Sequence, residues 1–226
     1  MNASGPLARL LADSALAILL AESRARDAAM SPPDPAHDTA HALRVAEWTL
    51  RIGGDAVDSR EAVAAALLHD AVLIPKNSPE RARAGVLAAD HARERLAALG
   101  FAAAAVERVA AAIRDHGFSR GAVPEGPLGE ALQDADRLEA LGAIGLLRCV
   151  SIGVRMGGAW FDADDPWARL RPLDDARYSL DHFYTKLLRL PDTMRTEVGR
   201  AEAVRRAAFL RAFVSELAGE LGHEAP

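Results

Sequence analysis

One stretch of the chain decides its fold, and between residues 59 and 70 it reads SREAVAAALLHD. Ser59 can cap a helix, and Glu61 falls in the first turn, where the helix macrodipole favours an anion. The apolar residues that follow cover more than one face of the helix, which indicates that the helix is buried on most sides. It ends in His69 and Asp70. A buried helix with this ending needs a partner for the carboxylate.

The rest of the chain has the same helical character. Alanine, leucine and arginine dominate, β-branched runs are absent, and apolar residues recur at spacings of three and four. The sequence therefore predicts an all-α protein without strands. The predicted helices cover residues 7–29, 38–52, 59–73, 79–99, 103–115, 128–152, 178–188 and 191–221, with an irregular excursion at 153–176. No linker separates domains, so we expect one compact helical body over residues 1–226.

Composition excludes several classes of protein. With 226 residues, 50% of them hydrophobic, the chain can bury a full core. A net charge of −5 gives no basic field for nucleic acid. Asp13 interrupts the one stretch that resembles a signal peptide, residues 7–21, and no apolar run reaches the roughly 20 residues that span a bilayer. The single cysteine, Cys149, forms no internal disulfide. We expect a cytoplasmic protein with neither a membrane nor a nucleic-acid partner.

His41 supplies a second polar group that points toward the core. It shares a helix face with Val45, Trp48 and Ile52. An ionised carboxylate in a low-dielectric interior costs several kcal/mol unless a cation compensates it. A divalent metal ion does this, because two neutral imidazoles and two carboxylates offset its charge and leave positions open for water and a phosphate oxygen.

The further carboxylate belongs to Asp134 or Asp136. These residues lie about 200° apart around a helix, so both cannot easily reach one ion. Asp136 stands one turn from Leu132 and Ala140, which suit packing. The residues alone therefore predict that one of these two aspartates is a metal ligand and that the other is only its neighbour.

Three motifs carry a family resemblance. HALRVA at 41–46, LLHD at 67–70 and ADRL at 135–138 resemble, in this order, the three signatures of the HD superfamily. The spacings, 28 residues from His41 to His69 and 66 from Asp70 to Asp136, are those of a compact member. The resemblance implies a single HD domain, with its metal-binding half at about 30–150 and C-terminal helices at 178–221 packed on it. It also implies that His41, His69, Asp70 and Asp136 are the metal ligands.

The whole chain resembles a subgroup of small bacterial HD proteins described as metal-dependent phosphohydrolases. This implies hydrolysis of a phosphate ester or anhydride by metal-activated water, with a nucleotide, and a nucleoside triphosphate in particular, as the expected substrate class. One divalent ion is expected, and Mn, Mg, Ni, Co, Fe and Zn are not distinguished. We predict Asp70, Lys76 and His116 as catalytic residues, and Lys76, Arg137 and Lys186 as substrate contacts.

Two alternative functions stay open. His91 and His116 fall between the His-Asp pair and Asp136, an order that some two-metal HD proteins share, so a second metal and di-iron oxygenase chemistry form one alternative. A regulatory module that binds metal and nucleotide without hydrolysis forms the other. A further His-Asp pair, His37 and Asp38, precedes its helix and is interpreted as an N-cap with a polar neighbour.

Overall fold

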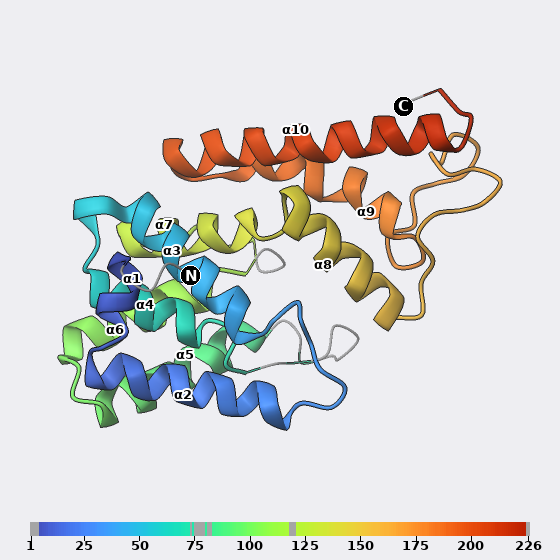
Figure 1. The fold of residues 1–226 in the computed structure, drawn as a ribbon. Helices are drawn as coiled ribbons and strands as arrows, with labels where there is room; N and C mark the ends of the chain where they lie inside the picture. The colour runs from blue at the N-terminus through green and yellow to red at the C-terminus, as the bar shows by residue number, and fades with distance from the viewer. Residues whose placement is uncertain (1–4, 73, 75–79, 81–82, 118–120, 225–226) are drawn as a thin grey trace. The chain divides into compact units, whose positions relative to one another are not determined.

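A computed structural model describes residues 5–72, 74, 80, 83–117 and 121–224 (Figure 1). These residues form helices and no named strand, which confirms the all-α prediction. The chain divides into two compact units, Met1–Asp136 and Arg137–Pro226. No helix among the described residues is long and apolar enough to cross a membrane.

The N-terminal unit is built around helix α4 (Ser59–Leu68). Every residue of α4 from Glu61 to Leu68 is buried, as the opening stretch predicts. Its cap is Asp58 rather than Ser59, because the Asp58 carboxylate accepts from the amides of Arg60 and Glu61. Around it stand α1 (Pro6–Leu10), α2 (Ser14–Ala29), α3 (Thr39–Gly53), η1 (Gly54–Ala56), α5 (Ala84–Ala98), α6 (Ala103–Asp115) and α7 (Gly126–Leu138).

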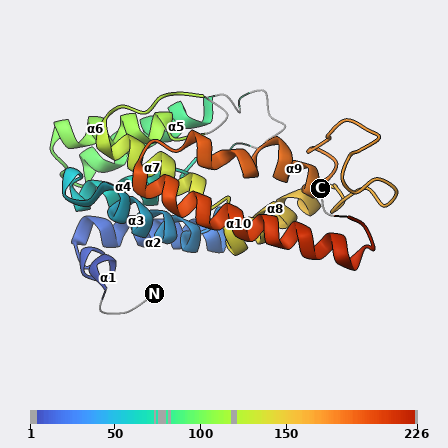
Figure 2. The ribbon, with the colours of Figure 1, turned by 90° about the horizontal axis from the view of Figure 1, so that it is seen from above.

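Helices α2, α3 and α6 pack directly on α4, and α5 and α6 pack side by side, as Figures 1 and 2 both show. The carboxylate of Glu61 on α4 accepts two hydrogen bonds from Arg108 on α6, at 2.9 and 2.5 Å. This pair ties the first turn of α4 to α6, and the contacts between the two helices hold the rest of α4, which ends at His69.

Two predicted helices are each divided in the structure. The helix predicted at 7–29 breaks because the side chain of Asp13 accepts from the amides of Ala15 and Leu16 and so begins α2. The helix predicted at 128–152 breaks between α7 and α8 (Gly142–Arg155), where Gly142 has a φ of +70°. Glycine adopts this conformation without the steric cost that other residues meet.

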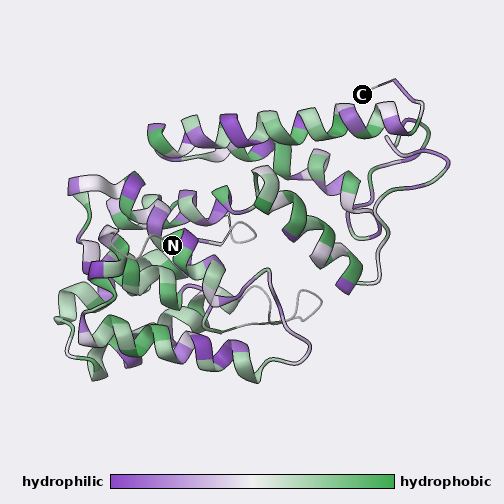
Figure 3. Ribbon diagram, in the orientation of Figure 1, coloured by the Kyte–Doolittle hydropathy of each residue, from purple (hydrophilic) through white to green (hydrophobic). Residues whose placement is uncertain are grey.

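The C-terminal unit contains α8, α9 (Ser179–Thr185), η4 (Leu187–Thr193) and α10 (Glu197–Glu220). The last helix begins at Glu197 and not at the predicted residue 191, because the Thr196 hydroxyl caps it and Pro191 lies in η4. Its buried stripe runs through Ala203, Ala207, Leu210, Val214 and Ala218. Figure 3 shows the matching alternation of hydrophilic and hydrophobic residues along α10.

The excursion between α8 and α9 is irregular but well anchored. Arg171 donates to the buried carboxylate of Asp181 at 2.5 and 3.0 Å, and the Tyr178 hydroxyl donates to Asp162 at 2.6 Å. Trp167 is buried, whereas Trp160 is 62% exposed. Of these two tryptophans, Trp167 therefore helps to anchor the loop.

Candidate metal centre

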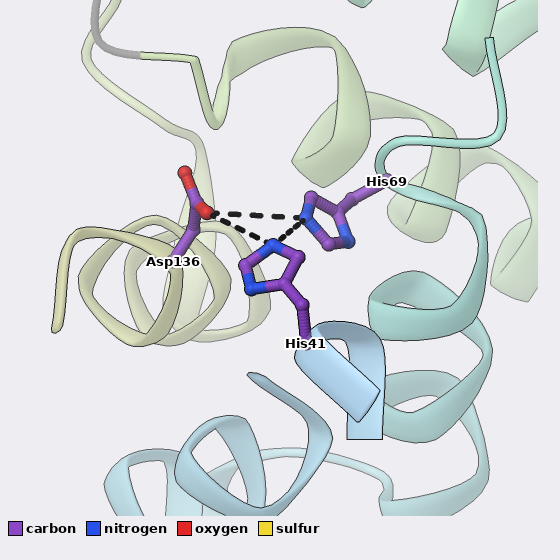
Figure 4. A group of neighbouring side chains, drawn as sticks. All are labelled: His41, His69 and Asp136. Carbon is purple, nitrogen blue, oxygen red and sulfur yellow. Dashed lines mark hydrogen bonds and ion pairs between the residues drawn. The ribbon is translucent and has the colours of Figure 1, made fainter. Parts of the chain in front are cut away.

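Side chains from three separate elements of the N-terminal unit meet at one point. The Nε2 atoms of His41 on α3 and His69 at the end of α4 lie 3.2 Å apart. The Oδ1 atom of Asp136 on α7 lies 3.6 Å from the Nε2 of His41 and 3.9 Å from that of His69. Figure 4 shows the three side chains pointing toward one another.

Asp70 and His116 extend this cluster. The Oδ2 atom of Asp70 lies 3.4 Å from the Nε2 of His69 and 3.9 Å from that of His41. The Nε2 of His116 lies 3.9 Å from the other carboxylate oxygen of Asp70. Both histidines of the α3–α4 pair are 1% exposed, whereas Asp70 and Asp136 remain 30% and 25% exposed. The carboxylates therefore form the accessible side of the cluster.

His69 and His116 are held in the same way. Each is the C-cap of its helix, α4 or α6, and each places its Nδ1 at hydrogen-bond distance from the carbonyl three residues earlier. The distances are 2.7 Å from His69 to Ala66 O and 2.6 Å from His116 to Ile113 O. Because a carbonyl only accepts, Nδ1 carries the proton and donates. In a neutral imidazole, Nε2 then keeps its lone pair for a cation.

His41 is positioned from the start of α3. The side chain of Asp38 caps this helix by accepting from the His41 amide at 2.8 Å, which is the N-cap role predicted for Asp38. One turn further, Val45 is fully buried, while Trp48 and Ile52 are partly buried against the core. The face shared by these residues turns the His41 imidazole inward, as its spacing indicates.

The charges in the cluster act strongly on one another. Burial lowers the pKa of His69, but the charges of Asp70 and Asp136 outweigh it and raise this pKa to about 9. Burial raises the pKa of Asp70, yet the charge of His69 and its hydrogen bond hold the value well below the ordinary range. Burial also raises the pKa of Asp136, but the nearby charges of His69, His116 and His41 outweigh burial and lower this pKa. Both carboxylates are therefore ionised at neutral pH.

This set of donors fits a divalent metal ion. Two donors about 2.1 Å from one ion lie roughly 3.0 to 4.2 Å from each other, depending on the angle between them. The separations of His41 and His69 from each other and from the nearest oxygens of Asp70 and Asp136 run from 3.2 to 3.9 Å. Imidazole and carboxylate are also the ligand types that first-row divalent ions take. The described residues thus contain a His/Asp cluster of the metal-binding kind.

A hollow opens beside the cluster. It measures about 210 Å³, counting the part that is open to solvent. His41, His69 and Asp70 line it, together with residues of α2 and of the segment before α3. Among the described residues, its lining is Ser23, Arg26, His37, Asp38, His41, Ala42, Ala66, Leu67, His69 and Asp70.

The other predicted site residues lie in different surroundings. Lys76 falls outside the described residues. Arg137 is buried, and its Nη1 donates to the carbonyl of Thr193 at 2.5 Å, within the C-terminal unit. Lys186 is also in that unit, between α9 and η4. His91 is partly exposed on α5, and neither of the two metal-type groups found among the described residues contains it.

Sequence reasoning did not single out Arg26. It is one of several arginines on α2, and no periodicity separates it from its neighbours. Only the packing of α2 beside the start of α3 brings it to the hollow.

Comparison with known proteins agrees with this geometry. A family model described as HD domain matches residues 39–141, a range that includes His41, His69, Asp70, His116 and Asp136. Over 187 residues the chain is 34% identical to the protein YpgQ of Bacillus subtilis, covering 80% of this chain and 82% of the relative.

Solved structures give the same result. The crystal structure of Bacillus subtilis YpgQ in complex with ADP matches with a TM-score of 0.68 and 27% identity, covering 90% of this chain and 96% of that one. A protein named predicted HD superfamily hydrolase, from an uncultured Thermotogales bacterium, matches with a TM-score of 0.60 and 29% identity, covering 91% and 92%. An HD-superfamily hydrolase of Bacillus thuringiensis matches with a TM-score of 0.61 and 29% identity, covering 82% and 87%. With the motifs, the helical fold and the His/Asp cluster in place, the chain belongs to the HD superfamily.

Proposed function

We propose that this protein is a metal-dependent phosphohydrolase that cleaves a phosphate ester or anhydride of a nucleotide. The observation that carries the proposal is that Asp70 and Asp136 each place an oxygen 3.4 to 3.9 Å from the Nε2 atoms of His41 and His69. Two findings support it: solved relatives are named HD-superfamily hydrolases, and one relative, YpgQ, has been crystallised with ADP.

In this proposal the four residues hold one divalent ion. Such an ion, when bound, polarises a phosphoryl oxygen and lowers the pKa of a coordinated water. The protein contributes the two ionised carboxylates and two imidazoles whose Nε2 atoms lie 3.2 Å apart. Because Asp70 and Asp136 stay partly exposed, a phosphate can approach from their side.

His116 is the proposed general acid. Its Nδ1 donates to the carbonyl of Ile113, and its Nε2 faces Asp70 at 3.9 Å. When Nε2 is also protonated, the imidazolium can transfer that proton to the oxygen that leaves phosphorus. Lys76, Arg137 and Lys186 remain proposed substrate contacts that rest on sequence.

The arrangement favours one ion over two. The two metal-type groups found in the described part of the chain, His41–His69–Asp136 and His69–Asp70–His116, share His69. The Nδ1 of His69 is engaged by the Ala66 carbonyl, so its Nε2 serves one ion at a time. A two-metal site of the oxygenase type would need a further ligand in place of His69.

Metal analysis and a substrate panel test the proposal. The purified protein is assayed for bound metal, and then with nucleoside mono-, di- and triphosphates while phosphate and pyrophosphate are detected. Asp70→Ala is expected to lose the metal and at least about 100-fold in turnover, since a ligand is removed. Asp90→Ala, at an exposed carboxylate of α5, serves as the control.

Each outcome separates the rival functions. Full metal content and full turnover in the Asp70→Ala protein would refute the scheme. Metal and nucleotide binding by the wild type without turnover of any compound in the panel would identify a regulatory binding module instead. Two irons per chain would point to the oxygenase.

A further inference from the structure

One buried side chain amide of α7 lies close to the site, and the catalytic scheme does not use it. Gln133 is completely buried and stands three residues before Asp136 on this helix. Its Nε2 donates to two backbone carbonyls, that of Asp115 at 2.9 Å and that of Ala122 at 3.2 Å. Asp115 is the last residue of α6, and His116 follows it. Gln133 therefore joins the helix that carries Asp136 to the residue that precedes His116.

The packing of α7 does not require an amide at this position. The residues beside Gln133 on the helix, Leu132 and Ala135 among them, are apolar and fully buried. A buried amide costs free energy unless its hydrogen bonds are made, and here both hydrogens of the NH2 group meet a carbonyl. A satisfied buried polar group specifies one arrangement of the elements that it joins. The amide thus suits the fixing of a geometry rather than the filling of a space.

The contact with Asp115 acts on His116 through one peptide group. The carbonyl of Asp115 and the amide nitrogen of His116 belong to the same planar unit, so a bond to that oxygen restricts the unit that begins His116. The ring is also tied to its own helix, because its Nδ1 donates to the carbonyl of Ile113 at 2.6 Å. The position of its Nε2, 3.9 Å from an oxygen of Asp70, therefore depends on where the end of α6 is held.

A second contact between these two segments is exposed. Arg114, near the end of α6, donates to the carboxylate of Glu125 at 3.4 Å, just before α7 begins. The side chain of Glu125 is 78% exposed. Exposed ion pairs restrict geometry weakly, because water competes for both charges. The buried amide of Gln133 is thus the stronger of these two constraints on the end of α6.

We propose that Gln133 is a positioning residue for His116. Its amide holds the end of α6 against α7 and so keeps the imidazole of His116 in its place beside Asp70. This inference rests on the proposed function, because the general acid assigned there is His116. A general acid must lie within hydrogen-bond reach of its target, and a displacement of about 1 Å can lower a rate about 100-fold. Gln133 thereby supports turnover without touching the substrate or the metal ion.

A double-mutant cycle on the metal-loaded protein tests the inference, with the panel compound that the wild type hydrolyses fastest. Gln133→Met keeps the length of the side chain and removes the donor. It is expected to lower kcat about tenfold, while KM and the Mn²⁺ dissociation constant stay within about twofold. His116→Gln should lower kcat about 100-fold, as loss of a general acid does. Because Gln133 acts through His116, adding Gln133→Met to His116→Gln should lower kcat by less than about twofold more.

A matched control separates this effect from any loosening of the surface. Glu125→Gln removes the exposed contact between the same two segments and should leave kcat within about twofold of the wild type. Where Gln133→Met gives no folded protein, Gln133→Asn takes its place in the cycle, since it keeps the amide and shortens its reach by one methylene group.

Two kinetic results overturn the inference. The first is an unchanged kcat in Gln133→Met. The second is a further loss of about tenfold in the double variant, which would show an effect on the whole fold rather than on His116.

Absence of turnover in the wild type would defeat the proposed function, and NMR would then decide the inference by itself. In protein with isotope-labelled histidines and bound Zn²⁺, the imidazole signals of His116 are identified by their loss in His116→Gln. Gln133→Met should shift these signals and leave those of His91 in place. Unshifted signals of His116 would overturn the inference.

Discussion

At the scale of single residues, Asp134 and Asp136 differ most instructively. They are two positions apart on α7, yet Asp136 lies 3.6 Å from His41 while Asp134 is completely buried. Asp136→Asn is expected to abolish stoichiometric metal binding, because an amide oxygen lacks the charge of the carboxylate. Asp134→Asn should retain one equivalent per folded chain. Elemental analysis of the folded fraction of both variants measures this, and the reverse result would assign the ligand to Asp134.

Metal binding should also release a proton. With its pKa raised to about 9 by Asp70 and Asp136, His69 is protonated at pH 7.5 in metal-free protein. It must become neutral to ligate, whereas both carboxylates are already ionised. Metal affinity should therefore increase with pH up to about 9 and level off above it. Calorimetric titrations with Mn²⁺ in buffers of different ionisation enthalpy measure how many protons are released on binding. A metal affinity that does not change between pH 6.5 and 9 would contradict the raised pKa of His69.

The sequence predicts most of this cluster because its signals are local. His41, His69, Asp70 and Asp136 stand in short motifs, and the structure brings all four together with His116. Their role as ligands stays a prediction. Arg26 carries no such motif, and its place beside the hollow depends on the tertiary contact between α2 and α3. Spacing along the chain contains no information about that contact.

At the scale of elements, two helical glycines should respond oppositely to substitution. A Cβ on Gly85 of α5 would lie 2.5 Å from the carbonyl oxygen of Arg114 on α6, whereas one on Gly219 of α10 meets nothing within 4 Å. Gly85→Ala should destabilise the protein by about 1 to 3 kcal/mol through overpacking. Gly219→Ala should stabilise it by up to about 1 kcal/mol through helix propensity. Denaturant unfolding of both variants checks the signs; equal effects would show that α5 and α6 can separate at no cost.

Helix existence is predicted better than helix boundaries. The helix expected at 103–115 is found unchanged, since a clear apolar period and Gly117 define it. The two divided helices depend on weaker signals. In the sequence, Asp13 is simply a charged residue within an amphipathic pattern, and only the structure shows that its carboxylate caps α2. Gly142 is likewise one small residue among several, and only the structure shows its positive φ. A cap or a positive φ changes the path of the chain without altering hydrophobic periodicity.

At the scale of the whole molecule, metal binding should stabilise the folded state. All four proposed ligands lie in the unit Met1–Asp136 and come from α3, the end of α4, and α7, so unfolding of this unit disperses them. A free Mn²⁺ concentration 100 times the dissociation constant would then contribute about 2.7 kcal/mol. Thermal unfolding at increasing Mn²⁺ should show a rising Tm in the wild type and a constant one in Asp136→Asn. A rise of equal size in both proteins would place the stabilising ion elsewhere.

The matching C-cap histidines affect how readily the protein takes up an ion. Because the carbonyls of Ala66 and Ile113 accept from the Nδ1 of His69 and His116, both rings already have a fixed orientation in the folded protein. Little conformational entropy then remains to be lost by these two rings when an ion arrives. Selection among metals at this site should therefore reflect the size and coordination preference of the ion more than rearrangement of these two rings.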